Sequence, residues 1–358
     1  MTRITVDVGP LFEPRWTGIP VFTRRLVQAL TKHGQIEVDF SYNLTRVPAE
    51  LVWSAIAAGT GSFMRDAYHR FSYQWEQVED PSEHLLYPTV KTAIGFSRNE
   101  ASTIHDMSTL LLPEFHVQAN IDFHLAHLPR EVASNARTFC ISDATESAFL
   151  SAYPSQRGRI GRITQYVDWP EYFAAYDRNL PPIQLGPYAV VIGTIEPRKN
   201  LDLLFRALRL AEMRKSTMKF VVIGPRGWKV DETLAQIDAD IAERVVFSGF
   251  VSEFIKYRLI RGCEFLIFPS VYEGFGIPAL EAMSLGKPVL STISSSLPEV
   301  VGDAGVYFDP LSPGEFAAAF TEISAPTRLA ELSARAVEGA GAFGWERMAA
   351  PVVEWACG

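Results

Sequence analysis

The sequence has 358 residues, of which 47% are hydrophobic and 21% are charged, and its net charge at pH 7 is −8. This length predicts about two domains of ordinary size, each with its own core, and the negative charge argues against general nucleic-acid binding. The cysteines Cys140, Cys263 and Cys357 lack the spacing of a disulfide framework or a zinc site. No apolar run reaches the ~20 residues of a membrane span, and the N-terminus reads as a strand instead of a signal peptide. We therefore expect a cytoplasmic globular protein.

The opening of the chain predicts a strand, a glycine-containing loop and a helix. Residues 4–8 read as the strand, residues 9–20 as a loop with Gly18, and residues 21–31 as the helix. A second strand is expected over 36–42. Residues 43–95 receive no firm assignment, because aromatic side chains are scattered there among polar residues and prolines. Core packing is the expected role of most of these aromatics, with an acceptor groove or a membrane-facing surface as the alternative.

The next part of the chain, residues 101–127, contains four histidines. ASTIHD at 101–106 predicts a strand ending at His105, and carboxyl ends of parallel strands face the ligand crevice. His116, His124 and His127 are spaced as metal ligands can be, but no carboxylate pattern accompanies them, so we expect ordinary helix and surface residues. After a strand over 138–141, Ser142 is expected to cap a helix over 144–152.

The second half opens with an apolar strand over 188–192 that runs into GTIEPRKN at 193–200. Asn200 is expected to cap the helix that follows. Arg198 and Lys199 lie at the strand end just before that helix, where two fixed cations would stabilise the charge of a departing diphosphate. A solvated basic turn is the alternative interpretation of the pair.

The stretch EFLIFPSVYEGFGIPALEAMSLGKPVL at 264–290 predicts a strand, glycine loop, helix and strand in succession. Gly274 and Gly276 allow a sharp turn, and Pro278 is expected at the first position of the helix. Free backbone N–H groups at such a helix start suit a phosphate or diphosphate.

Two glutamates accompany this anion site. Glu273 lies in the loop, and Glu281 is expected in the first turn of the helix. Carboxylates are poorly suited to binding the anion itself, so we expect them to hydrogen-bond sugar hydroxyls. By themselves two glutamates eight residues apart are weak evidence, since Glu281 could simply be a favourable charge in a first helical turn.

The string PSVYEGFGIPALEAMSLGKPV closely resembles the donor-binding signature of family 4 retaining glycosyltransferases, which use sugar nucleotides and have the GT-B fold. GTIEPRKN resembles the phosphate-binding loop of that family, with Thr194 where Arg is commoner, so Arg198 would supply the missing charge. LPEVVGDAG at 297–305 and FGWERMAAPVVEWA at 343–356 also match. The resemblance covers nearly the whole chain and is densest over 188–310.

The resemblance and the alternation of strands and helices imply an α/β GT-B protein with two doubly wound Rossmann-like domains facing a central cleft. We expect an N-terminal acceptor-side domain over residues 1–180 and a nucleotide-sugar-binding domain over 181–340. Residues 341–358 are expected to form a C-terminal helix that crosses back to the first domain.

The resemblance also implies roles for individual residues. Arg198 and Lys199 would contact the diphosphate, Glu273 the donor sugar, and His105 the reacting sugar, and these four form the expected catalytic set. Glu281 would bind the ribose. The rest of the expected donor-binding set is Gly18, Thr194, Gly224, Phe250, Val251, Gly274, Phe275, Gly276 and Ile277.

The expected activity is retaining transfer of a hexose to a hydroxyl of a glycan or lipid-linked acceptor during polysaccharide biosynthesis. EPRKN resembles the form found in bacterial mannosyltransferases, which favours GDP-mannose, while UDP-glucose and dTDP-rhamnose stay open as donors. No metal or other cofactor is expected, since the cationic loop could take the place of Mg²⁺ against a diphosphate. A GT-B sugar-nucleotide epimerase and a non-catalytic nucleotide-sugar-binding subunit are the alternatives. A lipid-linked acceptor would place the protein peripherally at the inner face of the membrane.

Overall fold

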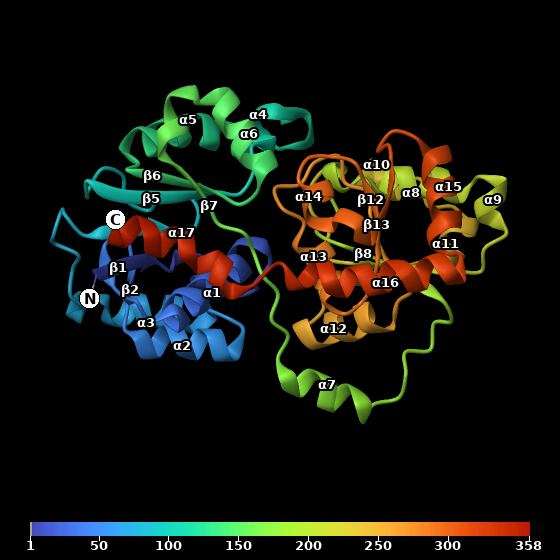
Figure 1. The fold of residues 1–358 in the computed structure, drawn as a ribbon, viewed down its shortest axis with the longest axis horizontal. Helices are drawn as coiled ribbons and strands as arrows, with labels where there is room; N and C mark the ends of the chain where they lie inside the picture. Colours follow the sequence, from blue (N-terminus) through green and yellow to red (C-terminus); the bar gives the residue numbers. More distant parts are fainter. Residues whose placement is uncertain (1) are drawn as a thin grey trace. The chain divides into compact units, whose positions relative to one another are not determined.

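The computed structural model describes residues 2–358, and the chain divides into two compact units (Figure 1). Unit 1 contains the residues up to Leu111, together with Gln118–Tyr166 and Phe343–Gly358, and unit 2 contains Leu112–Val117 and Val167–Ala342. The expected boundary after residue 180 lies beyond α7 (Glu171–Arg178), which belongs to unit 2 because it packs against α12 (Glu253–Gly262). Asp177 of α7 accepts a hydrogen bond there from Arg258 Nε at 2.6 Å.

Unit 1 is built on a seven-stranded sheet with the order β3-β2-β1-β4-β5-β6-β7. Its neighbouring strands pair in parallel, apart from the short antiparallel pair of β2 and β3. The order reverses between β1 and β4, because the chain adds strands first on one side of β1 and then on the other. The strands are β1 Thr2–Asp7, β2 Ile36–Tyr42, β3 Thr45–Arg46, β4 His84–Tyr87, β5 Asn99–Ile104, β6 Arg137–Cys140 and β7 Ile160–Arg162.

Helices cover both faces of this sheet. Figure 1 shows α5 and α6 on one side of β5 and β6, with α17 on the other side. The C-terminal helix α17 packs on α1 within unit 1, where Lys32 Nζ lies 4.5 Å from the centroid of the Trp345 ring. Ser142 caps α6 as predicted, since its Oγ accepts from the backbone N of Thr145 at 3.0 Å. The helices are α1 Gly18–His33, α2 Ala49–Ala58, α3 Ser62–Phe71, α4 Ser108–Leu111, α5 Gln118–Ser134, α6 Asp143–Ala152 and α17 Trp345–Cys357.

The region that the sequence left unassigned forms β3, α2, α3 and β4. Part of its aromatic content packs internally, with the Tyr68 ring 5.0 Å from Tyr42 and 5.9 Å from Trp75 between ring centroids. Phe71 and Tyr73, in contrast, are 49% and 79% exposed. Core packing therefore accounts for some of these aromatics and not for others.

Unit 2 is built on a six-stranded parallel sheet with the order β10-β9-β8-β11-β12-β13, the doubly wound arrangement expected. Its strands were recognisable because both faces of a parallel sheet are covered, which produces continuous apolar runs. β8, for example, is buried at each of its five positions. The strands are β8 Tyr188–Ile192, β9 Lys219–Ile223, β10 Val245–Gly249, β11 Leu266–Phe268, β12 Val289–Thr292 and β13 Gly305–Phe308.

The core of unit 2 joins the sheet to its helices through large aromatic side chains. Phe205 of α8, Phe220 of β9 and Phe316 of α15 are each fully buried in one cluster.

Within residues 2–358, no helix combines the length and the apolar character needed to cross a bilayer. The other helices of unit 2 are α8 Leu201–Leu208, α9 Ala211–Arg214, α10 Asp231–Leu234, α11 Ala239–Arg244, α13 Ile277–Ser284, α14 Leu297–Val301, α15 Pro313–Ile323 and α16 Pro326–Gly341.

Residues 112–117 lie in unit 2 although unit 1 residues flank them in sequence. Trp228 Nε1 donates to the carbonyl oxygen of Phe115 at 2.7 Å, and Lys229 Nζ donates to that of His116 at 2.8 Å. His116 is only 8% exposed, with its ring 6.2 Å from that of Trp228. The expectation of an ordinary helix or surface role is therefore wrong for His116, because the segment that carries it is pinned against the loop after β9.

Candidate functional site

Two loops of unit 2 meet where its strand order reverses. β8 and β11 are neighbours in the sheet, so the loop after β8, residues 193–200, lies beside the loop after β11, residues 269–276. The backbone N of Val271 donates to the carbonyl oxygen of Arg198 at 3.0 Å and joins the two loops. Ligands of open α/β sheets bind outside the carboxyl ends of the strands at such a position. The two stretches singled out in the sequence are thus brought together.

Glu273 lies at the centre of a charged cluster in these loops. Its Oε1 accepts from Lys199 Nζ at 2.5 Å and its Oε2 from Arg198 Nη1 at 3.2 Å. Burial alone would raise the pKa of Glu273, but Lys199 and Arg198 more than offset burial and hold the pKa below its usual value. The carboxylate is consequently ionised at neutral pH.

Glu196 completes the cluster and was missed in the sequence. Its Oε1 accepts from Arg198 Nη2 at 2.7 Å, and burial raises its pKa despite the neighbouring cations. The two cations therefore already have acidic side chains as hydrogen-bond partners. The sequence located Arg198 and Lys199 at the strand end but gave no sign that both are already paired. The sequence signal that could have revealed this pairing is the glutamate of EPRK, which lies two residues before Arg198.

Glycines let the backbone of the β8 and β9 loops approach closely. Gly193 and Gly224 both have φ of +149°, and a Cβ at position 224 would lie 2.0 Å from the carbonyl oxygen of Gly193. A Cβ at position 193 would lie 3.0 Å from Lys199 Cε. Gly224 is therefore needed for the shape of the loop. Thr194 follows Gly193 and is half-buried.

Asn200 holds the site loops together in a way that the sequence did not predict. It adopts the left-handed conformation, with φ of 55°, and its side chain does not cap α8. Instead its Nδ2 donates to the carbonyl oxygens of Pro269 at 3.0 Å and Pro310 at 2.8 Å. The predicted capping role is wrong. The side-chain amide binds these two distant carbonyl oxygens and makes no hydrogen bond to the backbone at the start of α8.

The glycine loop leads into α13 as expected, with a shift in the position of Glu281. Gly276 has φ of +100°, which starts the helix at Ile277 and leaves Pro278 as its second residue. Glu281 is therefore the fifth helical residue and lies beyond the first turn where it was expected. It is 2% exposed, and its Oε1 accepts from Lys256 Nζ at 2.7 Å. Lys256 of α12 is a site neighbour that no sequence motif indicated.

The other expected donor-binding residues of unit 2 surround these loops. Gly274 and Phe275 are buried beside Glu273, whose backbone N donates to Ser295 Oγ at 2.7 Å. Phe250 and Val251 follow the edge strand β10, and Phe250 is 44% exposed. Gly18 and His105 belong to unit 1.

His105 follows the carboxyl end of β5 in unit 1. Its Nε2 lies 2.6 Å from the carbonyl oxygen of Pro88, which can only accept, so the Nε2 carries the proton. Burial lowers the pKa of His105 despite this hydrogen bond. The ring packs edge-on against Phe22 with 4.7 Å between the centroids. His105 is therefore neutral near pH 7, with its Nδ1 as the acceptor.

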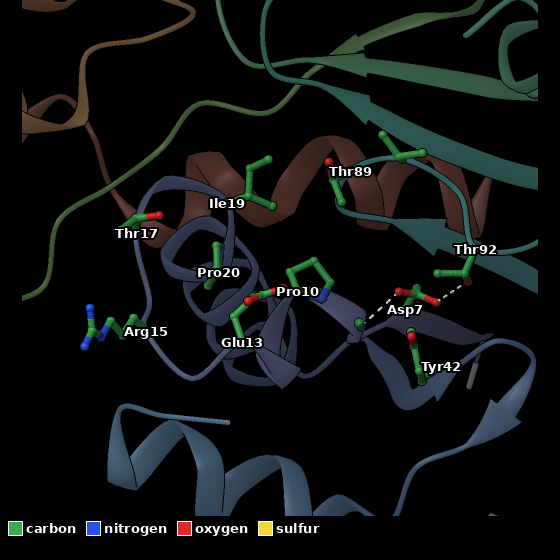
Figure 2. Close-up of a pocket in the computed structure, with 12 residues that line it drawn as sticks. Asp7, Pro10, Glu13, Arg15, Thr17, Ile19, Pro20, Tyr42, Thr89 and Thr92 are labelled. Carbon is green, nitrogen blue, oxygen red and sulfur yellow. Dashed lines mark hydrogen bonds between the residues drawn. The ribbon is translucent and has the colours of Figure 1, made fainter. Parts of the chain in front are cut away.

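Unit 1 contains a pocket of about 420 Å³ at the carboxyl ends of β1 and β4, where its own strand order reverses (Figure 2). Asp7 forms its polar floor, accepting from the backbone N of Gly9 at 2.9 Å and from Thr92 Oγ1 at 2.6 Å. Burial raises the pKa of Asp7 to about 6, against the opposing effect of these two hydrogen bonds and of a third from the backbone of Asn43. Tyr42 lies beside Asp7 in the pocket. Sequence reasoning missed Asp7, although an acid that ends the first strand before a glycine was a usable signal.

Comparison with known proteins identifies the part of the chain that carries the unit 2 loops. Residues 186–325 match the family described as Glycosyl transferases group 1. The chain carries a glycosyl transferases group 1 domain. The matched range contains both loops of the charged cluster and the start of α13. The resemblance of PSVYEGFGIPALEAMSLGKPV to a glycosyltransferase sequence is thereby confirmed.

Curated relatives of this chain include two mannosyltransferases of Escherichia coli. O-antigen chain mannosyltransferase B of Escherichia coli is 32% identical over 254 residues, which cover 68% of this chain and 66% of that protein. The serotype-specific mannosyltransferase WbdA of Escherichia coli is 26% identical over 265 residues, covering 70% of this chain and 32% of that protein. The chain thus spans less than two thirds of the length of these relatives.

Solved structures show the fold of the chain along nearly its whole length. Sucrose-phosphate synthase from Thermosynechococcus elongatus matches with a TM-score of 0.68 at 20% identity, covering 99% of this chain and 98% of that one. WaaG, a glycosyltransferase involved in lipopolysaccharide biosynthesis, matches with a TM-score of 0.65 at 13% identity, covering 99% and 100%. The predicted GT-B fold is confirmed.

Proposed function

We propose that this protein is a retaining glycosyltransferase that moves mannose from GDP-mannose to a hydroxyl of a glycan or lipid-linked acceptor. The observation that carries the proposal is the cluster of Glu273, Arg198 and Lys199 at the strand-order reversal of the group 1 domain. It places two cations and a carboxylate next to the glycine loop that starts α13.

The two cations have the chemistry that a departing diphosphate requires. As the bond between sugar C1 and phosphate oxygen breaks, negative charge grows on the diphosphate, and fixed cations stabilise that charge in the transition state. Arg198 and Lys199 would divide their hydrogen bonds between the diphosphate and the carboxylates. Glu273 would then accept from hydroxyls of the donor sugar, and Glu281 from those of the ribose.

Retention follows if acceptor and leaving group use the same face of the sugar. The acceptor oxygen forms its bond to C1 while the C1–phosphate bond breaks, and the acceptor proton moves to the departing phosphate oxygen. No separate carboxylate base is needed for this step. The neutral ring of His105, with Nδ1 as the acceptor, suits a hydrogen bond from a hydroxyl of the reacting sugar.

The identity of the donor rests on the relatives. The mannosyltransferases of Escherichia coli support GDP-mannose, whereas the Anabaena protein HepE, a structural neighbour with a TM-score of 0.66, was solved with UDP-glucose. UDP-glucose is therefore the competing donor. We further propose that catalysis needs no metal and that a lipid-linked acceptor is met at the cytoplasmic face of the membrane.

The test combines a thermal-shift panel with a transfer assay. We expect GDP to raise the melting temperature more than UDP, dTDP or ADP, and to do so equally in EDTA. GDP-mannose should then yield an α-mannoside, identified by NMR of its anomeric proton. Stabilisation by UDP alone would replace the donor, a shift abolished by EDTA would refute metal independence, and a β-product would refute retention.

A pair of lysine variants ties the result to the cluster. Lys199→Met should abolish both the GDP-induced shift and transfer, because it removes a cation 2.5 Å from Glu273. Lys215→Met, which removes an exposed lysine that follows α9 in the same unit, should change neither. Equal behaviour of the two variants would remove the main support for the proposed function.

A further inference from the structure

We propose that residues 112–117 act as a brace for the donor site of unit 2, with Trp228 and Lys229 as the positioning residues that attach it. The inference rests on the proposed function, because it takes the loop after β9, residues 224–230, and the loop after β8 as parts of the nucleotide site. The brace lies outside residues 186–325, the range that matches the glycosyltransferase family. It connects α4 and α5 of unit 1 along the chain, yet it belongs to unit 2.

Three hydrogen bonds attach the brace to the loop after β9. Trp228 Nε1 donates to the carbonyl oxygen of Phe115 at 2.7 Å. Lys229 Nζ donates to the carbonyl oxygens of Glu114 and His116, at 2.7 Å and 2.8 Å. Because every acceptor is a backbone carbonyl, the attachment depends on the path of the brace and not on the chemistry of its side chains.

The backbone of Lys229 adopts a conformation that needs support from outside the loop. Its φ is 52°, in the left-handed region that residues with a Cβ rarely adopt. Such a conformation persists where surrounding contacts fix it. The ammonium group supplies two of those contacts, and the ring of Trp228 lies 6.2 Å from that of His116 between centroids. The brace therefore helps to give the loop after β9 its shape.

The loop after β9 is bound in turn to the loop that carries the charged cluster. Ile195 donates its backbone N to the carbonyl oxygen of Pro225 at 2.9 Å, and its own carbonyl oxygen accepts from the backbone N of Gly227 at 2.9 Å. A Cβ at position 227 would lie 2.7 Å from Thr194 Cγ2, so the two loops touch. Ile195 is three residues before Arg198. The brace thus acts on the cations of the cluster through the loop after β9.

Amide hydrogen exchange of the full chain, followed by NMR, tests this positioning without any nucleotide. Lys229→Met removes the ammonium group but keeps a Cβ and an unbranched stem, so the backbone is no more strained than before. We expect the amides of Ile195 and Gly227 to exchange about tenfold faster in this variant. Lys219→Met is the matched control, because Lys219 lies at the other end of β9 and donates to the carbonyl oxygen of Glu243 at 2.6 Å. It should leave both amides unchanged.

Nucleotide binding provides the second measurement. Lys229→Met, and Trp228→Phe, which keeps an aromatic ring but removes the N–H donor, should each weaken GDP binding about tenfold. The KM for GDP-mannose should rise by the same factor while the acceptor KM stays constant, a split that lost stability alone would not produce well below the melting temperature. Because coupling is reciprocal, GDP should also slow exchange of the Phe115 and His116 amides, which donate within the brace.

The outcomes separate this inference from the proposed function. If GDP binds the unaltered protein and Lys229→Met matches Lys219→Met in both exchange and affinity, the brace assignment is wrong. Faster exchange with unchanged GDP affinity would also overturn it, because the loops would then be held for a reason other than donor binding. Failure of GDP to bind the unaltered protein would remove the proposed function, and the exchange rates of Ile195 and Gly227 would still decide whether the brace holds the two loops.

Discussion

Replacing Glu273 by Gln removes the shared partner of two cations while keeping the shape of the side chain. Glu273 is 7% exposed, and the side chains of Arg198 and Lys199 are 14% exposed. Water can therefore replace little of the interaction that the two cations lose with the carboxylate. Removing one partner of a buried ion pair costs about 3–5 kcal/mol. Glu196 still pairs with Arg198, and the amide oxygen can still accept one hydrogen bond, so we expect the lower end of that range, about 3 kcal/mol.

Calorimetric unfolding provides the measurement. A loss of about 3 kcal/mol lowers the melting temperature of a domain of roughly 150–250 residues by about 6–12 °C. Glu212→Gln, at an exposed glutamate of α9 in the same unit, is the matched control and should stay within about 0.5 kcal/mol of the natural protein. Because the pKa of Glu273 lies below its unfolded value of 4.5, its stabilisation is complete above that pH and is lost as the pH falls through the folded value. The penalty of the variant should shrink accordingly in acid.

The same variant should separate nucleotide binding from transfer. With Glu273 neutral, Arg198 and Lys199 face one carboxylate, so the cluster gains net positive charge and GDP should stabilise the variant at least as much as the natural protein. Transfer should fall because the acceptor of the sugar hydroxyls is lost. An unchanged melting temperature together with full turnover would refute the reasoning, and so would loss of the GDP response with transfer intact.

Three further changes test other contacts. Since burial raises the pKa of Asp7 from 3.8 to about 6, its stabilisation is complete below the unfolded value and about 3 kcal/mol is lost as the pH rises through the folded value. The melting temperature of Asp7→Asn relative to the natural protein should therefore rise between about pH 4 and about pH 8, and a constant difference in paired melting scans would contradict this. Lys256→Met removes the ammonium group that lies 2.7 Å from the buried Glu281 carboxylate, and it should cost about 3 kcal/mol in denaturant unfolding and weaken GDP binding. Lys256→Arg should restore both the stability and the GDP binding. If Lys256→Met and Lys256→Arg behave alike, Lys256 does not position Glu281. Asn200→Gly tolerates the φ of 55° but loses two hydrogen bonds, about 2 kcal/mol in urea unfolding. Asn200→Ala should lose about 1–2 kcal/mol more because of its Cβ, and equal losses would show that the backbone conformation is not the reason for Asn.

The sequence by itself determined the fold and the two loops of the candidate site. Parallel strands are buried on both faces, so β8, β9 and β11 appear as apolar runs, each followed by glycine or proline. Carboxyl ends of neighbouring parallel strands share one edge of the sheet, which is why GTIEPRKN and PSVYEGFG could be assigned to one site. Local capping by Ser142 was equally readable, because its partner is three residues away.

Only the tertiary structure decided which charges and polar groups meet. Glu281 pairs with Lys256 from another helix, and Thr92 reaches Asp7 from a loop 85 residues away in sequence. Asn200 was mistaken for a helix cap because its acceptors follow β11 and β13, which local sequence cannot reveal. Hydrophobic periodicity records which face of an element is buried, whereas the partner of a polar side chain depends on strand order and loop path. Those are set by the packing of the whole unit.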